Sequence, residues 1–125
     1  MKTYCFDLDG TLCTQIRNDS GEPSQDPGEV YAQAEPIKDR IAVVNRLHRE
    51  GNRILIDTAR GTQNWHKRAE WLKLTTDQLV KWGVKYDGLR LGEKLAADFY
   101  IDDKGHNDVS FFENVKDSCT DSNQR

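Results

Sequence analysis

The chain has 125 residues, which suits one domain and leaves no room for a second of ordinary size. Its 21 acidic and 18 basic residues give a formal net charge of −3 and are mixed along the chain, so there is no strong nucleic-acid signal. No apolar run reaches transmembrane length, and the 3 cysteines lack CxxC spacing. We therefore expect a soluble, cytoplasmic protein that does not bind membranes.

The first predicted element is a short apolar strand at residues 4–6, which runs into Asp7-Leu8-Asp9-Gly10. Residues 13–35 contain several Gly, Pro, Asn and Ser residues and show no hydrophobic periodicity. We expect a long loop there, placed to act as a flap over a binding site.

A helix is predicted between Pro36 and Gly51, because apolar residues recur there at three- and four-residue spacing: Ile37, Ile41, Val44 and Leu47. The next apolar run, at residues 53–56, predicts a second strand that ends in Asp57 and Thr58. The order strand, helix, strand implies a parallel pair with a right-handed crossover.

Two short helical pieces are predicted next. The first carries its apolar residues on one face, at Trp65, Ala69 and Leu72. The second begins at a capping box formed by Thr75 and Gln78 and ends at Gly83. Strands are then predicted at residues 89–91 and 99–101, a helix at 109–115, and a disordered polar tail at 117–125.

This alternation predicts an α/β fold with a three-layer open parallel sheet, formed by a single domain at residues 1–116. Three of the predicted strands end in polar pairs: Asp7 and Asp9, Asp57 and Thr58, and Asp102 and Asp103. The carboxyl ends of parallel strands meet at one edge of the sheet, where ligands bind. Carboxylates crowded there repel one another, so a hard cation with oxygen ligands, Mg²⁺, is expected.

These motifs resemble those of the haloacid dehalogenase (HAD) superfamily of phosphatases. Residues 6–12, Phe-Asp-Leu-Asp-Gly-Thr-Leu, look like its first signature, an apolar strand followed by DxDGT. Residues 54–58 are similar to the second, Lys94 stands where the third-motif lysine would be, and residues 99–103 resemble the fourth, a strand ending in paired acids. All four occur in the family's order, and together they span positions 6 to 103, which is most of the chain.

The resemblance implies a phosphomonoester hydrolase with a role for each matching residue. Asp7 would attack phosphorus and form an aspartyl-phosphate. Asp9 would protonate the leaving oxygen and then deprotonate the attacking water. Thr58 and Lys94 would bind the phosphoryl group.

The resemblance also implies the cofactor and further contacts. Mg²⁺ would be held by Asp7, by the backbone carbonyl of Asp9, and by one or both of Asp102 and Asp103, with Asp103 favoured as the direct ligand. Besides Thr58 and Lys94, the substrate is expected to contact Gly10, Thr11 and Arg60.

The spacing of the motifs leaves no room for a cap domain, so the chain is most similar to the capless members, including small ones of capsule biosynthesis. An open site implies either a large phosphorylated substrate or closure by a second subunit. A sugar phosphate, a nucleotide or a larger molecule fits these limits. Two alternatives stay open: a receiver-like signalling domain, against which the order of the motifs argues, and a non-catalytic phosphate- or metal-binding module on the same fold.

Overall fold

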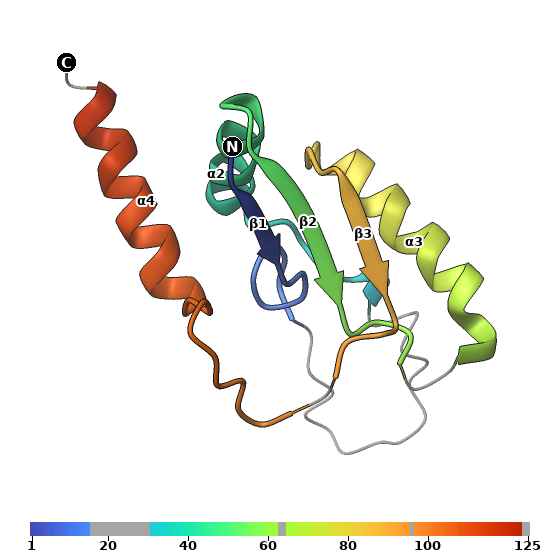
Figure 1. Ribbon diagram of the computed structural model, residues 1–125. Helices are drawn as coiled ribbons and strands as arrows, with labels where there is room; N and C mark the ends of the chain where they lie inside the picture. Colours follow the sequence, from blue (N-terminus) through green and yellow to red (C-terminus); the bar gives the residue numbers. More distant parts are fainter. Residues whose placement is uncertain (16–30, 63–64, 96, 124–125) are drawn as a thin grey trace. The chain divides into compact units, whose positions relative to one another are not determined.

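The computed structural model describes residues 1–15, 31–62, 65–95 and 97–123 of the chain (Figure 1). The chain divides into two compact units, Met1–Lys94 and Leu95–Arg125. A single domain was predicted at residues 1–116, and the division in the structure falls after Lys94. None of the helices in the described ranges combines the length and apolarity that crossing a bilayer requires.

The first unit is built on a three-stranded parallel sheet, which confirms the predicted α/β class. The strands are β1 (Thr3–Phe6), β2 (Arg53–Thr58) and β3 (Gly88–Leu91), in the spatial order β1-β2-β3. Phe6 pairs with Ile56, and Thr58 pairs with Leu91. The carboxyl ends of all three strands therefore lie at one edge, as the sequence predicted.

The two helices of this unit cover the same face of the sheet. Helix α2 (Lys38–Arg49) joins β1 to β2, and α3 (Arg68–Lys81), preceded by the short 3-10 helix η1 (Trp65–Lys67), joins β2 to β3. Both crossovers step across the sheet in one direction, so right-handed connections place both helices on one side, as Figure 1 shows. The apolar core between these layers includes Phe6, Ile54, Ile56, Leu91, Ile41, Val44, Trp71 and Leu79.

Helix α3 corrects the prediction of two helical pieces. It runs without a break through Thr75 and Thr76, and its buried side chains are Trp71, Thr75, Gln78 and Leu79. Ala69, which the apolar periodicity placed on one helical face with Trp65 and Leu72, is exposed. The low helix propensity of the two threonines is overcome because the apolar residues on either side of them pack against the sheet.

The second unit contains α4 (Asp108–Asn123). The side chain of Asn107 begins it by accepting the backbone N–H groups of Val109 at 3.0 Å and Ser110 at 3.3 Å. A helix was predicted at 109–115 and a disordered tail at 117–125, whereas the helix of the structure extends to Asn123. Residues 124–125 lie outside the described part.

The strand predicted at residues 99–101 is absent from the described structure. Phe99, Tyr100 and Ile101 are 82%, 60% and 94% exposed. Local turns replace it, because the Tyr100 hydroxyl bonds the Leu95 carbonyl and an Asp102 oxygen accepts the backbone N–H groups that follow it.

The predicted loop at 13–35 is described only at its two ends, and residues 16–30 lie outside the described ranges. Those ends meet: the backbone N–H of Thr14 donates to the carbonyl of Glu35 at 2.8 Å, and Cys13 forms an isolated bridge with Pro36. The predicted flap therefore stays a prediction.

Candidate active site

The turn after β1 carries the first two predicted site residues. The Leu8 carbonyl accepts three successive backbone N–H groups, from Thr11 at 3.0 Å, Leu12 at 2.8 Å and Cys13 at 3.3 Å. Gly10 has φ +83°, a left-handed conformation that a side chain would strain. Leu8 is fully buried, so the turn is anchored in the core while Asp7 and Asp9 lie on either side of it.

Asp7 lies beside Lys94. The Lys94 Nζ is 3.4 Å from Asp7 Oδ1, which also accepts the backbone N–H of Leu8 at 2.8 Å. The Asp7 side chain is 41% exposed and that of Lys94 is 24% exposed. Two residues that are far apart in the sequence thus meet at the carboxyl edge of the sheet, in a position that a ligand can reach.

Asp9 is held by a buried arginine. Arg60 Nε donates to Asp9 Oδ2 at 2.8 Å, and Arg60 Nη2 donates to Oδ1 at 2.7 Å, which is a bidentate fork. The Arg60 side chain is 0% exposed and that of Asp9 is 18% exposed. Burial alone would lower the pKa of the Arg60 guanidinium, but the hydrogen bonds and charge of Asp9 outweigh it and raise that pKa.

The remaining donors of Arg60 also have partners inside the chain. Nη1 donates to Thr75 Oγ1 at 3.2 Å and to Gln78 Oε1 at 2.7 Å, and Nη2 approaches Cys13 Sγ at 3.8 Å. The guanidinium carbon lies 4.7 Å from the centre of the Tyr31 ring. A guanidinium has five N–H groups, so none is left for the substrate contact that was predicted for Arg60.

The sequence pattern does not identify Thr75 and Gln78 as partners of Arg60, because their spacing also fits a capping box. Both are buried on the same face of α3 as Trp71 and Leu79. Two polar side chains within an apolar helix face are a signal of a buried polar partner, since such groups are costly without a hydrogen bond.

Cys13 belongs to the same cluster. Its thiol is buried and lies 3.4 Å from Asp9 Oδ1. Burial first, and then the negative charge of Asp9, raise the pKa of the Cys13 thiol to about 12. At neutral pH it is therefore a thiol that donates to Asp9, and it is not a nucleophile.

Thr58 ends β2 and is 1% exposed. Its Oγ1 accepts the backbone N–H of Arg60 at 3.2 Å, and its carbonyl accepts the backbone N–H of Gly92 at 3.2 Å. Thr58 thus fixes the turn that leads to Arg60 and joins it to the end of β3. Its contact with a phosphoryl group stays a prediction, as do those of Gly10 and Thr11, which lie in the turn after β1.

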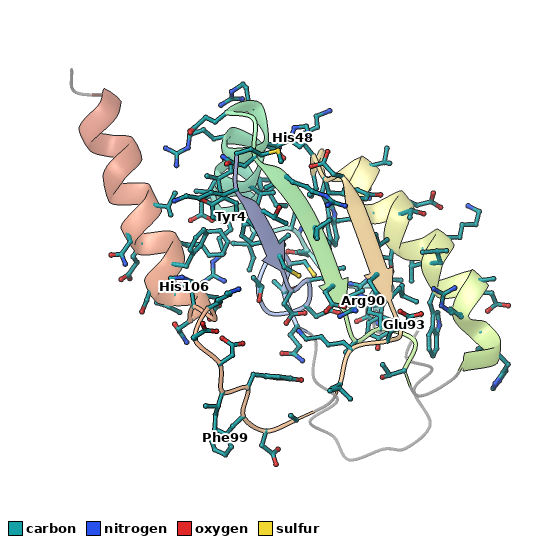
Figure 2. The ribbon with its side chains drawn as sticks, viewed as in Figure 1. Tyr4, His48, Arg90, Glu93, Phe99 and His106 are labelled. Atoms are coloured by element: carbon teal, nitrogen blue, oxygen red, sulfur yellow. The ribbon has the colours of Figure 1, made fainter. Side chains whose placement is uncertain are left out.

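A second fork lies on the other face of the sheet, because Asp57 precedes Thr58 in β2 and neighbouring side chains of a strand point to opposite faces. Arg90 Nε and Nη2 bond the two Asp57 oxygens at 3.0 and 2.7 Å. Arg90, labelled near the carboxyl end of β3 in Figure 2, is 58% exposed. The nearby Cys5 thiol has a pKa raised by partial burial and by the charge of Asp57.

The predicted metal ligands are divided between the two units. Among the described residues, no three His, Cys, Asp or Glu side chains are grouped closely enough to hold a metal ion. Asp7 and the Asp9 carbonyl belong to the first unit and offer oxygen donors, which fit Mg²⁺ in their chemistry. Asp102 and Asp103 belong to the second unit, where the backbone N–H groups of Lys104 and Gly105 lower the pKa of Asp102.

The fold and this cluster define an α/β protein with two carboxylates at the carboxyl edge of a parallel sheet. No protein-family profile and no curated protein sequence matches the chain. The chain is similar to the crystal structure of an MCSG target from Vibrio cholerae, with 27% identity and a TM-score of 0.69, over 94% of this chain and 95% of that one. A chain in a structure of the Pnkp1/Rnl/Hen1 complex is 20% identical with a TM-score of 0.50, over 78% of this chain and 30% of that one, which is a likeness of fold alone.

Proposed function

We propose that this chain is a Mg²⁺-dependent phosphomonoester hydrolase of the HAD type, acting through an aspartyl-phosphate on Asp7. The observation that carries the proposal is the accessible Asp7 carboxylate, with the ammonium of Lys94 3.4 Å away at the end of a parallel strand. A carboxylate nucleophile must be reachable by phosphorus. A neighbouring cation offsets the negative charge of the phosphoryl group as the nucleophile approaches.

The chemistry proceeds in two displacements. An Asp7 oxygen bonds to phosphorus while the bond from phosphorus to the leaving oxygen breaks, and Asp9 gives that oxygen a proton. Water then attacks the phosphorus of phospho-Asp7 and gives a proton to Asp9. The bond from Asp7 to phosphorus breaks and releases inorganic phosphate, so both side chains return to their starting states.

Several residues support these steps in the proposal. Lys94 and Thr58 bind the phosphoryl oxygens, and Gly10 and Thr11 contribute to the turn that receives them. In this proposal Mg²⁺ would be held by Asp7 and the backbone carbonyl of Asp9, with Asp103 as a further ligand and Asp102 as its support, and it would supply positive charge at the phosphoryl group.

The finer architecture is part of the same proposal: a three-layer HAD core without a cap, located in the cytoplasm. The likeness to the Vibrio cholerae structure over 94% of this chain supports one architecture for nearly the whole length. Without a cap, the site accepts a sugar phosphate, a nucleotide or a larger phosphorylated molecule, or a second subunit closes it.

One observation favours the alternative of a non-catalytic phosphate- or metal-binding module. Both carboxylate oxygens of Asp9 are bonded to Arg60, whereas a proton-transfer residue needs a free position for the proton. The phosphate-release assay described next distinguishes the hydrolase from the binding module.

The test measures phosphate release from p-nitrophenyl phosphate and from a panel of sugar phosphates, nucleotides and phosphopeptides, with Mg²⁺ and with EDTA. We expect Mg²⁺-dependent release by the wild type, background rates for Asp7→Asn, and about 10²–10⁴-fold slower turnover for Asp9→Asn. Asp9→Asn should keep its Mg²⁺ affinity, because its metal ligand is a backbone carbonyl. Asp77→Asn, which changes an exposed residue of α3, is the matched control and should match the wild type.

Two results would count against hydrolysis. The first is a wild type that binds phosphate or Mg²⁺ but releases no phosphate from any substrate, which supports the binding module. The second is an Asp7→Asn variant that is as active as the wild type, which removes the aspartyl-phosphate.

A further inference from the structure

We infer that Arg60 is a positioning residue for Asp9: its fork leaves a single carboxylate position open, on Oδ2, and this position handles the proton of the reaction. The inference rests on the proposed function and assigns Arg60 a role other than the expected substrate contact. The hydrogen bonds of the Asp9 and Arg60 side chains carry this inference.

The count concerns the acceptor sites of Asp9. A carboxylate has about four lone-pair sites, two on each oxygen. Among the described residues, Oδ1 accepts from Arg60 Nη2 at 2.7 Å and from Cys13 Sγ at 3.4 Å, whereas Oδ2 accepts only from Arg60 Nε at 2.8 Å. One site on Oδ2 therefore stays available. The fork therefore leaves Asp9 one open position, which answers the observation that favoured a binding module.

The Arg60 guanidinium is held in place by side chains on the side away from Asp9. Gln78 accepts from Arg60 Nη1 at 2.7 Å through Oε1 and donates to the Tyr31 carbonyl at 2.7 Å through Nε2. Thr75 accepts from the same Nη1, and the Tyr31 ring lies over the guanidinium. A planar guanidinium with all its donors bonded has one orientation, so the Asp9 carboxylate that it grips has one orientation too.

This orientation matters in the first displacement. The bond from hydrogen to Asp9 Oδ2 breaks, and a bond from that hydrogen to the leaving oxygen forms, while the bond between phosphorus and the leaving oxygen breaks. A misplacement of the carboxylate lowers the rate steeply, because proton transfer needs a heavy-atom distance near that of a hydrogen bond. The need for the proton is greatest when the leaving alcohol is a weak acid.

The experiment compares kcat/KM for p-nitrophenyl phosphate, phenyl phosphate and glycerol 2-phosphate, whose leaving groups become progressively weaker acids. The value of kcat/KM reports only the steps through formation of phospho-Asp7, so the second displacement does not affect it. For Arg60→Met we expect a loss of about 10²-fold or more on glycerol 2-phosphate and of less than about 10-fold on p-nitrophenyl phosphate. Arg60→Lys, which keeps the charge but not the fork, should fall between the wild type and Arg60→Met.

Gln78→Met supports the test if Arg60→Met fails to fold. It removes the amide behind Arg60 and keeps the size of the side chain, and we expect it to lower kcat/KM for glycerol 2-phosphate by roughly 10-fold. Arg90→Met is the matched control, because it breaks an arginine–aspartate fork on the other face of the sheet. Any loss of kcat/KM in Arg90→Met should be the same factor for all three substrates.

The outcomes separate the two proposals. If a folded Arg60→Met or Gln78→Met variant loses the same factor in kcat/KM on all three substrates, the positioning role alone is overturned. A purely structural defect lowers kcat/KM by a factor that does not depend on the leaving group. An active wild type with an unchanged Arg60→Met variant does the same. A wild type that hydrolyses none of the three substrates overturns the proposed function, and the role of Arg60 with it.

Discussion

Two arginine–aspartate forks lie on opposite faces of one sheet, and they differ in burial far more than in hydrogen-bond geometry. The distances from Nε and Nη2 to the carboxylate oxygens are 2.8 and 2.7 Å for Arg60 with Asp9, and 3.0 and 2.7 Å for Arg90 with Asp57. The Arg60 side chain is 0% exposed, however, and the Arg90 side chain is 58% exposed.

The two forks also connect different parts of the chain. Asp57 and Arg90 are partners in the register of β2 and β3, so the backbone ladder already fixes their separation. Asp9 and Arg60 lie in the turns after β1 and β2, 51 residues apart, outside the paired register of those strands. The buried fork therefore fixes the relative position of two loops at the candidate site, whereas the exposed fork adds little to a pairing that exists without it.

A cysteine near each fork allows the comparison to be tested directly. In a Cys119→Ser background, we expect an aromatic disulfide reagent at pH 8 to label the exposed Cys5 and to leave the buried Cys13 unlabelled. The pKa of Cys13 is raised from 9.0 to about 12, which lowers its thiolate fraction by about 10³ beside the effect of burial. Colorimetric counting of released thiolate measures this.

The control is the Cys5→Ser/Cys119→Ser variant, which should react only after urea is added. If two thiols react at similar rates in the native Cys119→Ser protein, the cluster around Arg60 is open to solvent and the contrast between the two faces is lost.

The second test breaks each fork by the same substitution. We expect Arg60→Met to lower the free energy of unfolding by about 3 kcal/mol, because it leaves the Asp9 carboxylate and the acceptors of Thr75 and Gln78 without their donor. Arg90→Met should change it much less, since water solvates the Asp57 carboxylate in its place. Urea unfolding followed by circular dichroism measures both. Equal losses would show that burial does not separate the forks.

Much of the fold of the first unit could be predicted from the sequence, because its elements are local. Short apolar runs before turn residues predicted all three strands, and apolar periodicity between Pro36 and Gly51 predicted α2. The prediction of a strand at 99–101 failed because a strand needs a hydrogen-bonded neighbour, and a local sequence pattern cannot show whether one is present. The prediction of two helices in place of α3 failed because packing against the sheet outweighs the low helix propensity of the two threonines.

The candidate site was predictable only where strand ends determine it. The meeting of Asp7 with Lys94 follows from parallel strands whose carboxyl ends share an edge. The partner of Asp9 did not follow, since position 60 follows a strand end and suggests a substrate contact equally well. The burial of Arg60 depends on its hydrogen bonds to Thr75 and Gln78. Both face inward on α3, which was predicted as two separate helices.

The third test concerns the glycine that follows Arg60. Gly61 has φ +88°, and a Cβ there would lie 2.9 Å from Leu91 Cδ2 and 3.2 Å from Trp71 Cε3. We expect Gly61→Ala to cost about 2 kcal/mol, from backbone strain and overpacking together. Gly51, with φ +96° and nothing within 4 Å of a Cβ, is the matched control, and Gly51→Ala should cost about 1 kcal/mol.

Urea unfolding of the two alanine variants measures the difference. A Gly61→Ala loss no larger than that of Gly51→Ala would mean that the turn relaxes easily. Arg60 would then owe its position to its hydrogen bonds alone and not to the packing of the turn.

The smallest effect is expected at a carboxylate that has no arginine fork. Asp87 Oδ2 accepts the backbone N–H of Ile54 at 2.8 Å, and this hydrogen bond, followed by the contact with His48, lowers the Asp87 pKa below 3.8. A lowered carboxyl pKa adds stability that is fully present above 3.8 and is lost as the pH falls through the folded-state value. Asp87→Asn should therefore lower the urea midpoint slightly at pH 7 and not at pH 2. A difference that persists unchanged at pH 2 would assign the effect to the shape of the side chain and not to its charge.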